Sequence, residues 1–179
     1  RNCDWSSAVC SSDLGPHLRS DHLILASGSG SSYFGHEDWR PLAPPMKILE
    51  HADEIRRRLL NALEAAEQCA DPKRKRVLQS VVVVGGGPSG CELAGSLMAL
   101  MHDVTRTQFR QLKPEDCQVT LVDPGDRLLR GMHPTLSEAT GEHLRKRGVR
   151  LVLGGRVQEI EPGQLRVTLA KPAPGEAAE

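Results

Sequence analysis

One short segment in the middle of the chain has residue types and spacing that suit phosphate chemistry. The segment Gly85-Gly86-Gly87-Pro88-Ser89-Gly90 fits the pattern GxGxxG. It follows the β-branched run Val81–Val84 directly and opens a helical stretch that begins at Pro88. A dinucleotide-binding turn requires this placement between a strand and a helix. The segment therefore predicts a site for the pyrophosphate of a dinucleotide.

The residues of this glycine loop (residues 85–90) have distinct physical roles in such a site. Gly85 permits the tight turn, Gly87 lets the backbone approach the pyrophosphate, and Gly90 lets the helix pack closely on the strand. Pro88 lies in the first helical turn, where its missing N–H costs no hydrogen bond. The free N–H groups and the dipole of the helix start attract phosphates. The residues expected to bind the nucleotide here are Gly85, Gly86, Gly87, Pro88, Ser89 and Gly90.

Two other interpretations of the loop fail on its residue types. A Walker phosphate loop ends in Gly-Lys-Ser/Thr, but Gly90 is followed by Cys91. A nucleophile elbow has the pattern GxSxG, but Cys91 stands two residues after Ser89. We expect Cys91 to be a small packing residue, and we expect no catalytic side chain in this segment.

An acidic residue stands at the end of the next predicted strand. Val119–Asp123 reads as that strand, and Asp123 precedes the turn Pro124-Gly125. A carboxylate at this place accepts hydrogen bonds from a ribose diol and repels a 2′-phosphate, so Asp123 favours NADH over NADPH. The distance from the glycines exceeds the usual ~20 residues, because residues 103–117 are expected to form an extra loop. An ordinary turn aspartate is the alternative interpretation.

The elements that must position these residues alternate along the chain. Apolar residues recur at intervals of three and four between Ile48 and Ala66, as on an amphipathic helix, and Pro72 ends that segment. A strand–helix–strand–helix–strand order follows, which indicates an α/β, Rossmann-type doubly wound parallel sheet. An antiparallel β meander completes the predicted fold. The expected elements are a strand at 22–26, a helix from 46 to about 66, a strand at 81–84, a helix from 88 to about 100, strands at 119–123 and 149–153, a helix at 134–147, and antiparallel strands at 156–160 and 165–169.

Composition excludes several classes of protein. The 179 residues contain 23 Lys plus Arg and 23 Asp plus Glu, so the formal net charge is zero. This balance argues against nucleic acid as a partner, since such binding needs positive charge. No apolar run approaches the ~18 residues of a membrane span. Five cysteines without a CxxC pair predict reduced thiols in a cytoplasmic protein, and the seven histidines show no metal-binding spacing.

The first residues of the chain look foreign to the rest. The string from Asp4 to Leu14 is rich in serine and has no helical or strand period. It resembles the in-frame translation of a common sequencing adapter and departs from it only at Ala8. The first methionine is Met46. We therefore expect residues 1–14 to be non-native and the chain to be an internal fragment of a longer protein.

The stretch Val81–Gly95, VVVVGGGPSGCELAG, resembles the NADH-binding domain of flavoproteins with two dinucleotide sites, and most of all type II NADH dehydrogenases. Four further segments fit that family: Tyr33-Phe34-Gly35, Met46-Lys47, the insertion Phe109–Asp116, and Val122–Leu129. The resemblance covers residues 21 to 169. It implies the cofactors FAD and NAD, with hydride passing from NADH to FAD and electrons passing on to a quinone.

The resemblance also implies roles for particular residues. Ala26-Ser27-Gly28-Ser29 matches a motif at which the chain passes close to FAD, and Glu92 matches a glutamate placed beside the nicotinamide and the flavin. The parent enzyme is expected to be peripheral on the cytoplasmic face of a membrane, through regions outside this chain. The fragment alone is expected to be inactive, because only one of the two dinucleotide sites is represented.

A domain organisation follows from the resemblance. Residues 15–45 would be a remnant of the FAD-binding domain, 46–78 a connecting helix and basic linker, 79–170 an incomplete NADH-binding domain, and 171–179 a disordered tail. Two alternatives stay open at this point: a disulfide-reductase or ferredoxin-reductase relative, and a nucleotide-binding module without catalysis. The missing CxxC excludes the thioredoxin-reductase type that carries its thiols in this domain.

Overall fold

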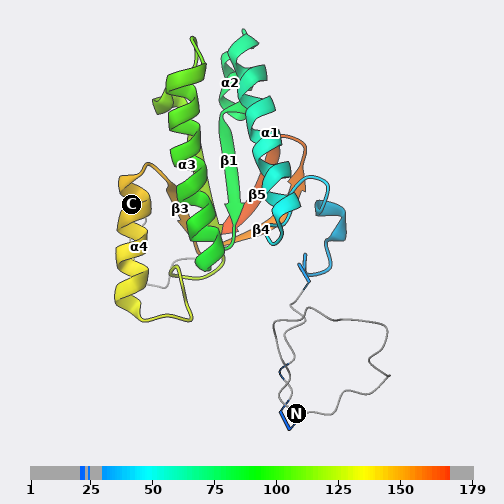
Figure 1. Cartoon of the computed structure of the whole chain (residues 1–179), viewed down its shortest axis with the longest axis vertical. Coiled ribbons are helices and arrows are strands. Elements are labelled where there is room, and N and C mark those ends of the chain that lie inside the picture. Colours follow the sequence, from blue (N-terminus) through cyan, green and yellow to red (C-terminus); the bar gives the residue numbers. More distant parts are fainter. Residues whose placement is uncertain (1–20, 23, 25–29, 170–179) are drawn as a thin grey trace. The chain divides into compact units, whose positions relative to one another are not determined.

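The computed structural model describes residues 21, 22, 24 and 30–169. The chain divides into two units, residues 1–30 and 31–179, and every described helix and strand lies in the second unit (Figure 1). The expected FAD motif Ala26-Ser27-Gly28-Ser29 lies outside the described residues, as do residues 1–14 and 171–179. The expected strand 22–26 lies mostly outside them too. Its described members His22 and Ile24 are exposed and are not in a strand.

A three-stranded parallel sheet forms the centre of the second unit. Its strands β1 (Ser80–Val84), β2 (Gln118–Asp123) and β3 (Arg150–Leu153) lie in the order β1-β2-β3. The register places Val84 opposite Val122. Leu121 and Val122 point to opposite faces of β2 and are both buried, as expected for a parallel strand that is covered on both faces. The three parallel strands predicted from the sequence are therefore confirmed.

Two helices connect these strands, and one of them is longer than the sequence indicated. α3 (Pro88–Gln108) joins β1 to β2, and α4 (Pro134–Lys146) joins β2 to β3. The prediction that α3 ends near Leu100 and that an extra loop begins at residue 103 is wrong. The hydroxyl of Thr105 donates to the Met101 carbonyl at 2.6 Å, so this polar side chain is satisfied inside the helix. Only residues 109–117, with the 3₁₀ turn η2 (Pro114–Asp116), lie between α3 and β2.

The basic run after the first long helix is helical and is not a linker. The 3₁₀ turn η1 (Glu37–Trp39) precedes α1 (Leu49–Gln68), and α2 (Pro72–Leu78) carries the basic residues. Pro72 does not merely end a segment, because it occupies the first turn of α2. The Asp71 carboxylate accepts the Lys73 N–H at 3.0 Å and caps that helix. A sequence prediction based on the proline alone missed this cap.

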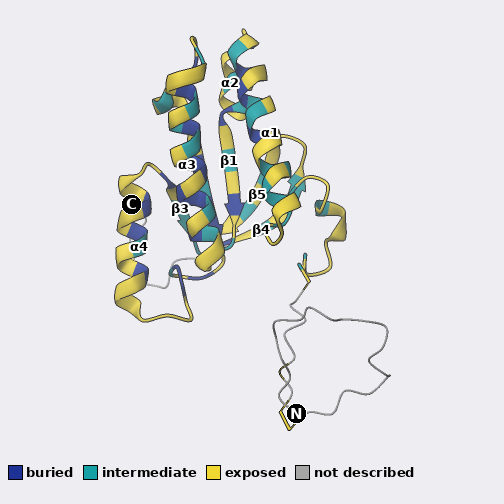
Figure 2. Ribbon diagram, in the orientation of Figure 1, coloured by how far each residue is buried: buried dark blue, intermediate teal, exposed yellow. Residues whose placement is uncertain are grey.

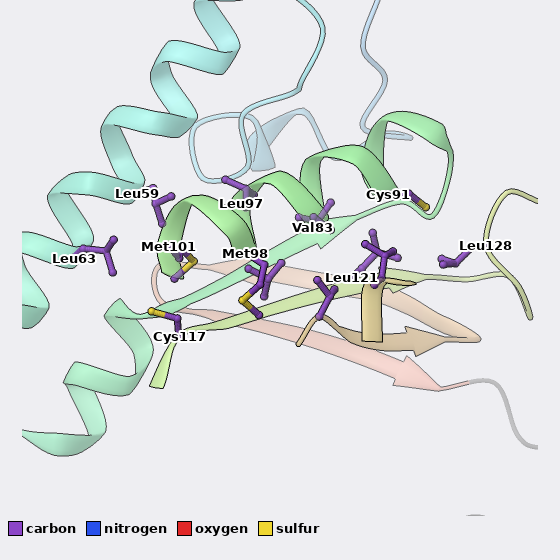
Figure 3. Close-up of a cluster of buried hydrophobic side chains, with 14 of the residues drawn as sticks. Leu59, Leu63, Val83, Cys91, Leu97, Met98, Met101, Cys117, Leu121 and Leu128 are labelled. Atoms are coloured by element: carbon purple, nitrogen blue, oxygen red, sulfur yellow. The ribbon is translucent and has the colours of Figure 1, made fainter. Parts of the chain in front are cut away.

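A β hairpin packs on part of the face of the sheet opposite α3. β4 (Gly155–Glu161) and β5 (Gln164–Leu169) pair antiparallel, which confirms the predicted antiparallel strands. A side chain at Gly155 would stand 3.2 Å from Val122 of β2, so the hairpin begins in close contact with the sheet. α3 lies on the other face (Figure 3). The hairpin thus covers this face at β2, whereas Val82 and Val84 of β1 stay 42% and 52% exposed.

The core lies between the sheet, α3 and α1. Figure 2 shows buried residues on the inner side of α3, with exposed residues on the outer sides of α1 and α4. Leu59 and Leu63 of α1 point toward Leu97 and Met101 of α3 (Figure 3), and all four are buried. The predicted apolar stripe of α1 is buried only in its second half. Ile48, at the start of the stripe, is 52% exposed. Among the described residues no helix is both long and apolar enough to cross a membrane.

One carboxylate fastens α1 to the segment after α3. Glu67 accepts the backbone N–H groups of Arg110, Gln111 and Leu112 at 3.0–3.1 Å. Partial burial of the side chain raises the pKa of Glu67. The three N–H donors and the charge of Lys75 lower the pKa, and together they outweigh the effect of burial. The pKa therefore lies below its usual value.

Replacing Glu67 by glutamine is expected to lower the melting temperature at pH 7. A carboxylate with a lowered folded-state pKa stabilises the protein above its unfolded-state pKa, and this contribution is lost as the pH falls through the folded-state value. The difference in melting temperature between wild type and Glu67→Gln should therefore shrink as the pH is lowered toward 4. Glu64→Gln, an exposed change on the same helix, is the control. A pH-independent difference would contradict this account of Glu67.

Candidate dinucleotide-binding site

The glycine loop leaves the sheet at the carboxyl end of β1. The Gly85 N–H donates to the Val122 carbonyl at 2.8 Å, so the loop starts from a strand that is still paired. Gly85 has a φ of +110°, which side chains rarely tolerate. This backbone conformation produces the tight turn that the sequence predicts. The loop then enters α3 at Pro88.

Gly90 lies where the first turn of α3 meets the start of the loop. A Cβ atom at Gly90 would stand 1.9 Å from the carbonyl oxygen of Gly85. Real Cβ atoms do not approach a backbone oxygen so closely, so only glycine fits here. The close packing of helix and strand predicted for this glycine is present in the structure.

Gly87 differs from Gly90 because the space beside it is open. Its backbone has φ −75° and ψ 179°, an extended conformation that any residue adopts. A Cβ atom at Gly87 would have no heavy atom within 4 Å, and the residue is exposed. The protein fold therefore does not require glycine at this position. A ligand that occupies the open space would require it.

The carboxylate of Asp123 is fixed by two backbone donors beside the loop. Its Oδ2 accepts the Gly86 N–H at 2.6 Å, and its Oδ1 accepts the Gly125 N–H at 2.6 Å. The second bond is that of a turn aspartate, while the first joins the end of β2 to the glycine loop. Both acceptor atoms retain further lone pairs, since a carboxylate accepts about four hydrogen bonds. The partly buried Asp123 side chain is therefore fixed in orientation at the edge of the loop.

A second loop, residues 124–133, forms the opposite wall. The Leu129 N–H donates to the Gly86 carbonyl at 2.8 Å, and Leu129 itself has a positive φ of 50°. Leu128 is buried at 1% exposure and contacts Gly86, where an added Cβ would stand 2.8 Å from its side chain. The guanidinium of Arg127 donates to the carbonyls of Arg130 and Met132 at 3.0 and 3.4 Å. The Leu129 hydrogen bond and the Leu128 contact hold the second loop against the glycine loop, while Arg127 stabilises the second loop internally.

The two loops border an open hollow of about 370 Å³. Its lining combines the predicted site residues with a wall that sequence reasoning did not assign to the site. The lining residues are Gly86, Gly87, Pro88, Asp123, Leu129, Arg130, Gly131 and Met132. The last four are separated from the glycine loop by about forty residues of sequence. The sequence signals for this wall were its place a few residues after the Pro124-Gly125 turn and, for Leu129 alone, the family resemblance of Val122–Leu129.

Other predicted residues of this region lie in the first turn of α3. Ser89 and Glu92 are exposed there, and Cys91 is buried. Burial first, and then the charges of Asp123 and Glu92, raise the pKa of the Cys91 thiol. The thiol donates to the Gly86 carbonyl at 3.5 Å. The interpretation of Cys91 as a packing residue is confirmed, and Figure 3 shows it at the carboxyl end of β1.

The geometry suits binding of a phosphorylated ligand. The first N–H groups of a helix have no partner within the helix, and the helix dipole adds positive potential at that end. The start of α3 opens beside the hollow, next to the unfilled space at Gly87. Asp123 stands at the edge as an acceptor for hydroxyl groups. Leu129 and Met132 supply an apolar wall against which a planar ring can pack.

Comparisons with known proteins agree with this geometry. The family model described as "Pyridine nucleotide-disulphide oxidoreductase" matches residues 4–176. The matched range includes residues 4–14. The foreign origin of these residues, expected from the sequence, stays a prediction. The type II NADH:quinone oxidoreductase Ndh of Mycobacterium tuberculosis (strain ATCC 25618 / H37Rv) is 36% identical over 147 residues, which are 82% of this chain and 32% of that protein.

Two further relatives extend the comparison. The mitochondrial internal alternative NAD(P)H-ubiquinone oxidoreductase A1 of Arabidopsis thaliana is 36% identical over 147 residues, covering 81% of this chain and 28% of that protein. The structure of NDH2 from Plasmodium falciparum in complex with NADH matches 75% of this chain and 27% of its own, with a TM-score of 0.67 and 21% identity. At that identity the likeness shows the fold. The chain spans about a third of the length of the curated relatives it matches, and it belongs to the pyridine nucleotide-disulphide oxidoreductase family.

Proposed function

We propose that this chain is the NADH-binding part of a flavin-dependent NADH:quinone oxidoreductase. The observation that carries the proposal is the open space at Gly87, which lies between the start of α3 and the fixed carboxylate of Asp123. The curated relatives support the choice of reaction, because their names give NADH or NAD(P)H as donor and a quinone or ubiquinone as acceptor.

The chain's own residues hold the donor in place. In this proposal the N–H groups at the start of α3 bind the pyrophosphate, and the open Gly87 lets it approach the backbone. Asp123 accepts hydrogen bonds from the adenosine ribose, and Leu129 and Met132 pack against the adenine. Glu92, exposed one turn into α3, is proposed to lie beside the nicotinamide. FAD supplies the hydride acceptor when bound, and the segment proposed to contact it is Ala26-Ser27-Gly28-Ser29.

The parent protein is proposed to contain further regions on both sides of this one. Residues 15–45 would belong to its FAD domain and 79–170 to its NADH domain, with α1 and α2 between them. A quinone dissolves in the membrane, so the parent is proposed to act as a peripheral protein on the cytoplasmic membrane face. Residues 1–14 are proposed to be foreign to it.

The test is made on the complete parent protein, expressed from its full coding sequence. We expect a yellow protein that oxidises NADH and reduces a water-soluble quinone analogue. The 179-residue chain alone should bind NADH, purify without flavin and leave the quinone unreduced. A parent that reduces a disulfide or a ferredoxin in place of the quinone would replace the proposed acceptor. A parent that binds NADH without flavin would support a non-catalytic module.

Changing Asp123 to alanine is expected to weaken NADH binding by roughly ten- to a hundredfold. Hydrogen bonds to a charged group contribute about 1.5–3 kcal/mol, and each ~1.4 kcal/mol changes affinity tenfold. The measurement is a titration of NADH into the chain, with circular dichroism as a check of folding. The matched control is Asp116→Ala, an exposed aspartate just before β2, at the end opposite Asp123. Unchanged affinity in Asp123→Ala would show that Asp123 is only a turn residue.

A further inference from the structure

Cations gather at the end of the parallel sheet where β1 begins. Four of them, residues 73–76, lie on α2, and two more lie in the segment after α3. α2 and the end of α3 are at the same end of the sheet (Figure 1). Glu67 joins the two segments, because its carboxylate binds the backbone at 110–112 and lies within electrostatic reach of Lys75. The group of cations, called the basic end below, consists of Lys73, Arg74, Lys75, Arg76, Arg110 and Lys113.

The positive charge of this end is a local excess. The chain as a whole is neutral, but residues 67–78 and 106–116 together contain seven Lys or Arg and four Asp or Glu. Two of the acids accept backbone hydrogen bonds, Glu67 from residues 110–112 and Asp71 from Lys73. The other two, Glu115 and Asp116, are exposed. An excess of positive charge therefore faces the solvent.

The fold does not require all of these cations. Cations in the last turn of a helix stabilise its dipole, which explains Lys75 and Arg76, whereas cations in the first turn oppose it. Lys73 and Arg74 lie in the first turn of α2. No residue of the basic end forms an ion pair within the described part of the chain. The charges of Lys73 and Arg74 therefore do not stabilise the helix, and they are available to a partner.

Val77 adds an apolar group to the same face of α2. It follows Lys73 by four residues and Arg74 by three, and residues at these intervals are neighbours on a helix surface. Val77 is 49% exposed, and Lys73, Arg74 and Arg76 are exposed as well. Segments that bind an anionic membrane combine basic side chains, which attract the headgroups, with apolar ones, which enter the boundary of the acyl chains.

We propose that the basic end of this chain binds the surface of a membrane that contains anionic lipids. The cations bind the lipid phosphates, and Val77 enters the headgroup boundary. A lipid surface is favoured over nucleic acid by the apolar Val77 and by the proposed acceptor, because a quinone is dissolved in the membrane. The choice of lipid thus rests on the proposed function. In addition to regions of the parent outside this chain, the chain itself then contacts the membrane.

The basic end is separate from the proposed nucleotide site. α2 ends one residue before β1, and β1 ends at the glycine loop. A strand of five residues spans roughly 16 Å at ~3.3 Å per residue. No side chain of the basic end is among the residues that line the hollow. A loss of membrane binding should therefore leave NADH binding unchanged.

The experiment measures sedimentation of the 179-residue chain with lipid vesicles. Vesicles with equal amounts of phosphatidylglycerol and phosphatidylcholine are compared with vesicles of phosphatidylcholine alone. The triple variant Lys73→Gln/Arg74→Gln/Arg76→Gln removes three exposed cations of α2, and Lys73→Gln alone is a milder second variant. Thermal melts verify that the proteins are folded, and duplex DNA is titrated into wild type as the competing ligand.

The matched control changes three consecutive cations on another helix. Arg145→Gln/Lys146→Gln/Arg147→Gln removes exposed cations at the C-terminal end of α4. This variant has the same net charge as the triple variant of α2, so an effect of net charge alone would weaken vesicle binding equally in both. A titration of NADH into the same samples measures the nucleotide site independently.

Wild type is expected to sediment with the anionic vesicles and not with phosphatidylcholine alone, and added salt should release it. The triple variant of α2 should bind the anionic vesicles roughly ten- to a hundredfold more weakly, and Lys73→Gln about fivefold more weakly. The triple variant of α4 should bind nearly as wild type does. All four proteins should bind NADH with the same affinity.

Three results would overturn the proposal for the basic end. They are a wild-type chain that does not bind anionic vesicles, equal losses in the two triple variants, and tighter binding to duplex DNA than to the vesicles. These results leave the NADH site in place. A folded chain that binds the anionic vesicles but not NADH would instead overturn the proposed function, while the basic end would remain a membrane-binding surface.

Discussion

Gly87→Ala is expected to abolish most NADH binding while leaving the fold unchanged. The added methyl group meets no protein atom within 4 Å, and the backbone at Gly87 is extended. Alanine is less favourable than glycine at a helix N-cap, and it also restricts the unfolded chain, so the two small effects oppose each other. The same methyl group would fill the space proposed for the pyrophosphate. Forcing a group into a filled site costs roughly 1–3 kcal/mol, which corresponds to about five- to a hundredfold in affinity.

Two measurements check this expectation on the same protein samples. A thermal melt of Gly87→Ala should match wild type to within a few degrees, and a calorimetric titration should show much weaker NADH binding. Normal binding in a folded variant would show that no phosphate approaches the loop at this residue. A large loss of stability would show that Gly87 is needed by the fold and not by a ligand.

Gly90→Ala, in contrast to Gly87→Ala, is expected to lower the stability of the fold strongly. Its methyl group would stand 1.9 Å from the Gly85 carbonyl oxygen, so the start of α3 must move away from β1. Overpacking against rigid backbone costs about 3 kcal/mol or more. For a chain of this size that loss lowers the melting temperature by roughly 6–12 °C. NADH binding should fall too, because the N–H groups of α3 are displaced.

The pair of glycine variants separates two roles that share one motif. Circular dichroism and a thermal melt should report the change in Gly90→Ala, whereas ligand titration should report the change in Gly87→Ala. A Gly90→Ala protein that melts as wild type does would contradict the contact between the helix start and the loop. The two variants carry the same substitution at positions only three residues apart in sequence.

The sequence was sufficient for the parts of the fold whose patterns are local. The β-branched run Val81–Val84, the glycines after it and the acid at Asp123 each carry their own signal, and the parallel strands lie where these patterns place them. The site follows from the same logic, because parallel strands bring their carboxyl ends to one edge of the sheet. Gly90 could be assigned its packing role from spacing alone.

Other features depend on contacts between distant residues and could not be predicted. The extension of α3 past Leu100 is stabilised by burial of Met101 and Thr105 in the core. The wall formed by Leu129 and Arg130 depends on a hydrogen bond from Leu129 to Gly86, across more than forty residues. No local pattern signals that bond. The sequence interpretation therefore missed the residues of this loop that line the hollow.

The location of the bound nucleotide is the central claim, and an NADH titration of the isotopically labelled 179-residue chain tests it most directly. The backbone amide signals of Gly86, Gly87 and Asp123 should shift in a saturable way, because the hollow they line is proposed to enclose the ligand. The amide of Gly163, in the turn between β4 and β5, should not shift. Saturable shifts at the glycine loop and at Asp123 are the predicted result. Binding without shifts there, or shifts confined to the hairpin, would contradict the account.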